Sequence, residues 1–330
     1  MPVSRLSYAV QTGAVALPES GRIAVFRPRA EHDISALPKD RVEIIQGFFP
    51  DHQAFSVRGY ACVVAEHGSY GAAVVFVPRA KAEAQSLVAR AMQVTNGGPV
   101  VVDGKKTDGV NSLLKECRRR GAQTGEVLAK SHGKIFALSG GDFADWAEQR
   151  EVVLQGGFVT RPGMFSADRI DRGSAALAAA LPQKLPGKVA DLGAGWGYLA
   201  RHVLEREDVT ECHLIEAEHG ALDCARRNVT DPRARFHWAD VTDFQAETSF
   251  DHIVTNPPFH VSRAAEPALG LAFIAAAAQL LARRGTLWLV ANRHLPYEAA
   301  LSASFGDVAE VAGDASFKVM RAANPRRARR

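Results

Sequence analysis

Hydrophobic and polar positions follow two periods along the first half of the chain. Short runs rich in β-branched and aromatic residues predict strands, and apolar positions at helical spacing predict helices between them. The expected strands are 22–26, 42–48, 71–77, 99–102 and 134–138, and the expected helices are 81–92 and 109–120. Strands that alternate with helices indicate an α/β domain with a mainly parallel sheet.

The second half shows the same alternation after the turn at Pro162-Gly163. The expected strands are 188–192, 213–216, 235–239, 252–255 and 286–291, and the expected helices are 174–180, 198–205, 221–228 and 269–282. Ser174 can cap the first of these helices. A doubly wound unit of this kind binds ligands at the carboxyl ends of its strands.

We expect one domain over 1–150 and a second over 151–330, connected through the polar segment 140–150. Two domains also fit the length, since ordinary domains have roughly 100–200 residues. The alternation that the halves share is compatible with a duplicated fold, but such alternation also arises without duplication.

The composition is that of a soluble globular protein, with 330 residues of which 47% are hydrophobic and 23% charged. No apolar run reaches the ~18 residues of a membrane helix, and the N-terminus lacks the features of a secretion signal. The four cysteines form no C-x-x-C pair and have no zinc spacing, so we expect reduced thiols and no metal site. A cytoplasmic protein is therefore expected.

The net charge of +4 makes the chain mildly basic, which is compatible with a polyanionic partner. Arginines are concentrated at the end of the chain, at Arg321, Arg326, Arg327, Arg329 and Arg330. A solvated tail and a contact with RNA phosphates are both open interpretations.

A glycine-rich turn follows the strand at 188–192. Asp191 precedes Gly193, Gly195 and Gly197, and glycines let a backbone turn tightly beside a ligand. Dinucleotide folds need G-x-G-x-x-G, and this spacing fails because Tyr198 holds the sixth position. An Asp ahead of the turn suits a cationic ligand such as the amino-acid part of S-adenosylmethionine. An ordinary strand-to-helix turn is the alternative.

Two more acidic residues follow the next two strands. Glu216 can accept hydrogen bonds from ribose hydroxyls, and Asp240 can accept from an adenine amine. The alternatives are a surface Glu for the first, and a loop Asp or helix cap for the second. Acids spaced along three successive strands fit one adenosyl ligand.

The tetrapeptide Asn256-Pro257-Pro258-Phe259 follows the fourth strand. The prolines stiffen the backbone and remove two N–H donors, so the acceptors around Asn256 form a rigid array. Such an array can hold a planar amino group beside a sulfonium methyl, and positioning and charge stabilisation then carry the reaction. Phe259 offers a face on which a base can stack. We predict methyl transfer to an amine, with a proline-rich turn as the alternative.

These residues resemble amino-methylating class I methyltransferases, and further segments resemble the ribosomal RNA guanine-N2 methyltransferases of the RsmC and RlmG type. The segments are P-G-x-F-S at 162–166 with Asp168 and Gly173-Ser174, N-P-P-F-H at 256–260, V-A-N-x-x-L-P-Y at 290–297 and F-K-V at 317–319. The resemblance is nearly continuous over 162–322 and fainter at 78–81 and 101–105. Ala194-Gly195-Trp196 departs from the pattern, because relatives often carry a Cys in this turn.

The resemblance implies two Rossmann-like class I methyltransferase domains. The N-terminal one is degenerate and supports RNA binding and folding, and the C-terminal one is catalytic. It further implies that Phe165 and Ser166 close the S-adenosylmethionine pocket. The expected reaction methylates the N2 amine of a guanine in ribosomal RNA, with 16S RNA of the small subunit as the expected target. A monomer that acts on this RNA or on the ribosomal subunit is expected. Lys318 is expected to touch RNA or face solvent.

Other functions stay open from the sequence. The same chemistry could act on a 23S guanine, on a glutamine of release factors, or on adenine. A non-enzymatic RNA-binding assembly protein is a further alternative, against which the intact Asp191, Glu216 and Asn256 argue. The failed glycine spacing disfavours an oxidoreductase.

Overall fold

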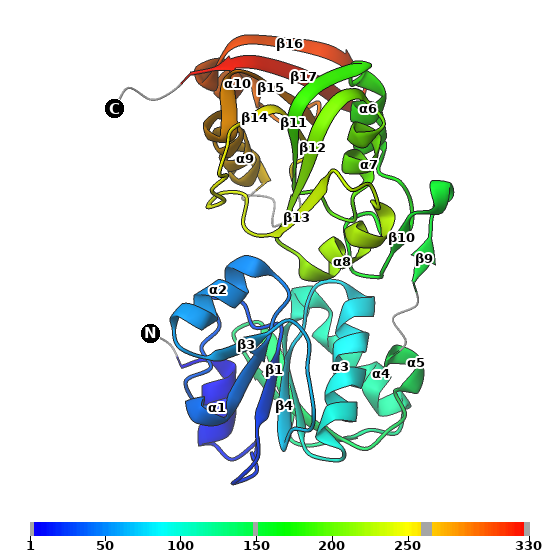
Figure 1. Ribbon diagram of the computed structural model, residues 1–330. Coiled ribbons are helices and arrows are strands. Elements are labelled where there is room, and N and C mark those ends of the chain that lie inside the picture. The colour runs from blue at the N-terminus through cyan, green and yellow to red at the C-terminus, as the bar shows by residue number, and fades with distance from the viewer. Residues whose placement is uncertain (1–2, 148–150, 259–265, 327–330) are drawn as a thin grey trace. The chain divides into compact units, whose positions relative to one another are not determined.

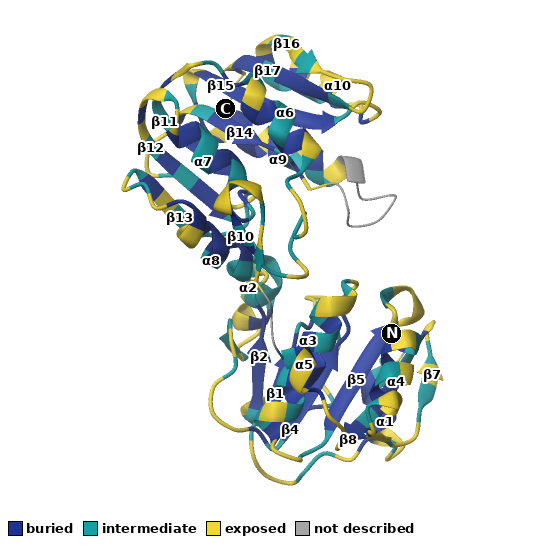
Figure 2. Ribbon diagram, turned by 90° about the vertical axis from the view of Figure 1, so that its right-hand side faces the viewer, coloured by how far each residue is buried: buried dark blue, intermediate teal, exposed yellow. Residues whose placement is uncertain are grey.

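A computed structural model describes residues 3–147, 151–258 and 266–326. The chain divides into two compact units, Met1–Arg150 and Glu151–Arg330. Each unit has a mostly buried sheet with helices packed against it (Figures 1 and 2). The mixed α/β class with mainly parallel sheets is therefore confirmed. Among the helices of the described residues, none has the length and apolar character needed to cross a membrane.

The first unit is built on one sheet, in the order β3-β2-β1-β4-β5-β8-β6, with β7 paired to β8. Its strands are β1 (Ile23–Phe26), β2 (Val42–Ile45), β3 (Ala61–Val63), β4 (Ala72–Phe76), β5 (Val100–Lys105), β6 (Gln123–Thr124), β7 (Leu128–Lys130) and β8 (Gly133–Ser139). Strands β1 to β5 pair in parallel, whereas β8 is antiparallel to β5.

Helices cover both faces of this sheet. They are α1 (Arg5–Gln11), α2 (Phe49–Val57), α3 (Lys81–Thr95), α4 (Val110–Arg119) and α5 (Ala144–Ala147). Because successive strand residues point to opposite faces, Ala24 and Phe26 of β1 pack with the core of α3 and α4, and Ile23 and Val25 with that of α1 and α2.

Two sequence expectations for the first unit were wrong in detail. The strand expected over 42–48 ends at Ile45, because the amide of Gln46 donates to the carbonyl of Pro28 (2.8 Å) and its oxygen accepts from the N–H of Phe48. The segment 140–150 is not simply a polar connection, since Phe143 and Trp146 are buried in the core of the first unit.

The second unit has a seven-stranded sheet in the order β13-β12-β11-β14-β15-β17-β16. Its strands are β11 (Lys184–Leu192), β12 (Glu207–Glu216), β13 (Ala234–Trp238), β14 (Phe250–Thr255), β15 (Leu281–Asn292), β16 (Phe305–Gly313) and β17 (Phe317–Pro325). Strand β17 runs antiparallel between β15 and β16, and β9 (Val152–Val153) and β10 (Val159–Thr160) form a separate ribbon.

The helices of this unit are α6 (Arg172–Ala180), α7 (Tyr198–Leu204), α8 (His219–Asn228), α9 (Glu266–Leu280) and α10 (Glu298–Ser304). Val189 of β11 packs with the core that includes α6, α7 and α8, whereas Ala190 and Leu192 pack with that of α9 and α10. The sheet therefore lies between two helical layers (Figure 1). Helix α6 begins after Asp171, whose side chain accepts from the N–H of Ser174, so Asp171 is the cap that was expected at Ser174.

Both sheets share the strand order 3-2-1-4-5, counted within each sheet, followed by antiparallel strands. The register defines equivalent positions: Phe26 pairs with Ile45 and Val75 in the first unit, as Leu192 pairs with Ile215 and Thr255 in the second. The two units are therefore built to one topology.

Candidate functional site

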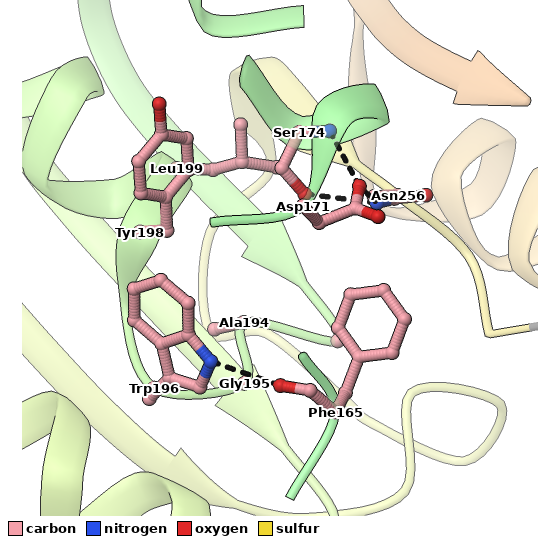
Figure 3. A pocket seen from close by; sticks show the side chains of 10 residues that line it. Phe165, Asp171, Ser174, Ala194, Gly195, Trp196, Tyr198, Leu199 and Asn256 are labelled. Atoms are coloured by element: carbon pink, nitrogen blue, oxygen red, sulfur yellow. Dashed lines mark hydrogen bonds between the residues drawn. The ribbon is translucent and has the colours of Figure 1, made fainter. Parts of the chain in front are cut away.

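A pocket lies at the carboxyl ends of β11 and β14, where a doubly wound sheet places its ligands (Figure 3). Its lining comes from the glycine turn, the start of α7, the segment before α6 and the loop after β14. The lining residues are Phe165, Asp171, Ser174, Gly193, Ala194, Gly195, Trp196, Tyr198, Leu199 and Asn256. The structure thus brings two of the predicted glycines together with Asn256 and Phe165.

The glycines of the turn have separate steric roles. Gly195 has φ +55° and a Cβ built on it would meet nothing within 4 Å, so the turn leaves open space in the pocket there. Gly197 has φ +88° and a Cβ would lie 2.9 Å from Cγ2 of Val229, so this glycine permits close packing of the turn on α8 and the segment after it.

Asp191 lies at the end of β11, is fully buried, and does not line the pocket. Its Oδ2 accepts from the backbone N–H of Ala200 (3.0 Å), whereas its Oδ1 has no hydrogen-bond partner among the residues that the structure describes. Burial raises the pKa of this carboxyl to about 8; the Ala200 bond lowers it and the charge of Glu216 raises it. A cation near Asp191 would favour its ionised form.

Glu216 ends β12 and holds the glycine turn. Its Oε2 accepts from the N–H of Gly195 (2.7 Å) and its Oε1 from the N–H of Glu218 (2.7 Å). Burial raises the pKa of Glu216, and the two backbone bonds lower it. Since each carboxylate oxygen has two lone pairs, Glu216 keeps capacity for further donors.

Asp240 and Ser166 do not line the pocket. Oδ1 of Asp240 accepts from the N–H and the hydroxyl of Thr242 (both 2.8 Å), which closes a local turn after β13. Ser166 donates its hydroxyl to the carbonyl of Arg169 (2.6 Å). Both side chains therefore bond to near neighbours within their own loops.

Phe165 lies over the pocket with 48% of its surface exposed. Its carbonyl accepts from the indole N–H of Trp196 (3.0 Å), which ties the segment before α6 to the glycine turn (Figure 3). The aromatic ring is therefore held at the rim of the pocket.

Asn256 follows β14 and faces the first turn of α6. Its Nδ2 donates to Oδ2 of Asp171 (2.9 Å) and to Oγ of Ser174 (2.8 Å), as Figure 3 shows. Its Oδ1 is buried without a hydrogen-bond partner in the described part of the chain. Pro257 is buried and Pro258 is exposed, whereas Phe259 lies outside the described residues. The NH2 group of Asn256 is therefore already hydrogen-bonded within the protein, whereas its oxygen can still accept a hydrogen bond.

Comparisons with known proteins bear on this arrangement. Residues 155–321 match the family model described as methyltransferase small domain. The "Ribosomal RNA small subunit methyltransferase C" of Shewanella sp. (strain MR-4) is 31% identical over 264 residues, which cover 76% of this chain and 76% of that protein.

The chain belongs to the methyltransferase small domain family. The protein of the same name from Alteromonas mediterranea is 28% identical over 271 residues, covering 78% of this chain and 75% of that methyltransferase. A solved structure, "T. Thermophilus 16S rRNA N2 G1207 methyltransferase (RsmC) in complex with AdoMet and Guanosine", has a TM-score of 0.80 at 24% identity. It covers 97% of this chain and 92% of that one, so the fold is shared along nearly the whole length. The RsmC-like membership expected from the motifs is confirmed.

Several pocket residues of this methyltransferase were not predicted from the sequence. They are Asp171, Ser174, Trp196, Tyr198 and Leu199. The motif quoted from the sequence includes Asp168 of the segment before α6 and passes over Asp171, which the structure places against Asn256. A detectable signal existed, because Asp is among the residues preferred at an N-cap and Asp171 directly precedes the helix.

Lys318 is buried in this methyltransferase, so the expectations that it touches RNA or faces solvent were both wrong. It is 3% exposed, and its Nζ donates to the carbonyl of Leu295 (2.6 Å) and to Glu298 (2.5 Å). Tyr297 is fully buried and outside the pocket lining. Within the described ranges, the four cysteines are free and no cluster of three His, Cys, Asp or Glu side chains could hold a metal ion.

Proposed function

We propose that this chain transfers a methyl group from S-adenosylmethionine to the N2 amine of a guanine in ribosomal RNA, with 16S RNA of the small subunit as the target. The names of the relatives and the ligands named for the T. Thermophilus structure support this substrate and cofactor. The observation that carries the proposal is the amide of Asn256 in the pocket lining: its Nδ2 donates to Asp171 and Ser174, and its Oδ1 is buried without a hydrogen-bond partner in the described residues.

An exocyclic amine can satisfy this acceptor. One N–H of the amine donates to Oδ1 of Asn256, and the Pro257-Pro258 backbone keeps that oxygen in place. The nitrogen forms a bond to the methyl carbon as the carbon–sulfur bond breaks, and the nitrogen then loses one proton to solvent. The carbonyl dipole of Asn256 stabilises the positive charge that develops on nitrogen, and it needs no reorganisation to do so.

The chain's residues fit S-adenosylmethionine, which when bound supplies an electrophilic methyl group. The open space at Gly195 accommodates a ligand against the turn, and the lone pairs left on Glu216 suit ribose hydroxyls. We propose that Asp191 favours the cationic amino-acid part from beneath the turn, with Gly193 and Gly197 shaping the approach. Asp240 would serve the adenine amine, and Phe165 and Ser166 would cover the pocket.

Within the same proposal, the first unit is a degenerate copy that supports RNA binding and folding. The register makes Arg27 equivalent to Gly193, Gln46 to Glu216 and Phe76 to Asn256. Arg27 donates to Glu83 (2.7 Å) and to Gln46 (2.8 Å), so a guanidinium lies where the second unit has its glycine turn.

Phe76 is buried and stacks on His32, with ring centroids 4.2 Å apart. At the position equivalent to Asn256, the first unit therefore has an aromatic ring in place of an amide acceptor. These replacements support a division of labour in which only the second unit binds the methyl donor.

Methyl incorporation from labelled S-adenosylmethionine tests the proposed function. The full chain is incubated separately with small subunits, large subunits, each free ribosomal RNA and a release factor, and the nucleosides are separated by mass spectrometry. We expect label in N2-methylguanosine of small-subunit RNA. Label in the large subunit, in adenosine or in the release factor would show that the target is a different one from that proposed. An absence of label in a chain that binds the cofactor would favour the non-enzymatic assembly protein.

We further propose that the chain works as a monomer in the cytoplasm, where it would meet its RNA. Light scattering of the purified chain at micromolar concentration tests the first point. A mass of twice the chain would contradict it.

A further inference from the structure

Asp171 and Ser174 lie on the first turn of α6 and face the loop after β14 (Figure 3). We infer that Asp171, assisted by Ser174, is the positioning residue that determines which side of the Asn256 amide faces the substrate. This inference rests on the proposed methyl transfer, because it assigns a role within the same site.

The argument begins with the two sides of the amide. An ionised carboxylate only accepts hydrogen bonds, so Asp171 can bind the NH2 side of Asn256 and not its oxygen. Ser174 accepts the second hydrogen. Rotation of the amide by a half-turn would replace the bond to Asp171 by a contact between two acceptor oxygens, whereas the hydroxyl of Ser174 could donate as well as accept. The open Oδ1 is therefore fixed on the side away from α6.

Asp171 is itself held in place. Its Oδ2 accepts from the N–H of Ser174 (2.7 Å) as the N-cap of α6, and the same oxygen accepts from Asn256. A Cβ on Gly173 would lie 3.0 Å from this oxygen and 3.2 Å from Phe317, so the absence of a side chain at Gly173 leaves room for the carboxylate. The cap and the contact with Asn256 thus share one atom.

The pair also affects the strength of the acceptor. Hydrogen bonds in a chain polarise one another, so donation from Nδ2 to a carboxylate increases the negative charge on Oδ1. Without Asp171 the amide could present its NH2 group to the substrate amine, and two donors would then face each other. Turnover would fall although both substrates could still bind.

Two substitutions separate this role from helix capping. In Asp171→Ser a hydroxyl still caps α6, since Ser is as good an N-cap as Asp, but a hydroxyl can donate as well as accept and so no longer selects the NH2 side of Asn256. In Asp171→Asn the side-chain oxygen can take the place of Oδ2 and keep both bonds. We expect kcat to fall roughly a hundredfold in the Ser variant, a loss typical of misplaced reacting groups, and to stay near wild type in the Asn variant.

The measurements are kcat and KM for RNA, calorimetric affinity for S-adenosylmethionine, and thermal stability. Unchanged stability, RNA KM and cofactor affinity with reduced kcat in Asp171→Ser would support positioning. Ser174→Ala, which keeps the backbone cap donor, should show a smaller reduction of kcat because one of the two bonds to Asn256 remains.

Two results would overturn the inference. One is wild-type kcat in Asp171→Ser while Asn256→Ala is inactive, which leaves the proposed function intact. The other is a cofactor affinity that falls in parallel with kcat, which would make Asp171 a cofactor contact. Wild-type turnover in Asn256→Ala would instead remove the role proposed for Asn256 itself, so the two failures are distinguishable.

Discussion

Asp191, at the end of β11, caps helix α7 by accepting the backbone N–H of Ala200 at 3.0 Å, and both residues are fully buried. The formal N-cap, Gly197, has no side chain with which to do this. A strand residue therefore satisfies a helix donor that would otherwise lie unpaired in the core.

The buried carboxyl predicts a pH dependence of stability. Burial raises the pKa of Asp191 from 3.8 to about 8, so the folded protein keeps a proton that the unfolded chain releases. Its stability contribution is complete below pH ~4 and is lost as the pH rises toward 8. We expect Asp191→Asn, which can still cap α7, to gain stability relative to wild type between pH 5 and 8. The free energy of unfolding in urea, measured for wild type and Asp191→Asn at pH 5 and pH 8, tests this. An equal change between the two pH values in both proteins would contradict it.

Removal of the open acceptor should affect turnover and spare cofactor binding. We expect Asn256→Ala to lower kcat by about 10²–10³-fold, as is typical for the loss of one preorganised polar group at a developing charge. Calorimetry with S-adenosylmethionine is the control and should give an affinity close to wild type. A joint loss of affinity and turnover would show that Asn256 belongs to the cofactor site.

The glycine turn allows a matched pair of variants. Alanine at a left-handed position costs about 1–2 kcal/mol, and this applies to both Gly195→Ala and Gly197→Ala. Only the latter also places a Cβ 2.9 Å from Val229, so its unfolding free energy should fall further. Gly195→Ala should mainly weaken S-adenosylmethionine binding, because its methyl group enters the open space. Equal stability of the two variants would count against this assignment.

Lys318 should prove to be a structural residue. Its ammonium lowers the pKa of Glu298 and donates to the carbonyl of Leu295 in a buried position. We expect Lys318→Met to lose about 1–3 kcal/mol of stability, since the buried carbonyl of Leu295 loses its donor. RNA affinity measured over a salt series should keep its wild-type slope. A weaker dependence of RNA affinity on salt in Lys318→Met would instead show that Lys318 contacts RNA phosphates.

The arginine tail provides the opposite case. A chain truncated after Arg326 lacks Arg327, Arg329 and Arg330, which lie outside the described residues, and keeps all of β17. If these arginines neutralise phosphates, RNA affinity should fall more at low salt than at high salt, and the slope should decrease by about 1 for each contact. An effect independent of salt would indicate a folding defect instead.

Local patterns predicted much of the site. The glycine turn and the Asn-Pro-Pro sequence could be located because the tight turn after β11 and the stiff loop after β14 each depend on residues adjacent in the chain. Gly193, Gly195 and Asn256 accordingly lie in one pocket.

Contacts between distant segments could not be predicted in this way. Asp171 meets Asn256 only because the N-cap of α6 lies beside the residue that follows β14, and Lys318 of β17 is paired with Glu298, the first residue of α10. Asp240 has the expected position after β13, but its bonds to Thr242 depend on the conformation of the loop. Strand β16 was not predicted because its mostly exposed residues give little hydrophobic periodicity.

Strand β17 is made after β16 and yet lies between β15 and β16. During synthesis, β16 therefore has no neighbour in the sheet until β17 has left the ribosome, whereas every strand of the first unit is already available. Since domains of a nascent chain generally fold in order from the N-terminus, the second unit would be completed last. The sheet of the second unit would thus be completed only once β17 has been made.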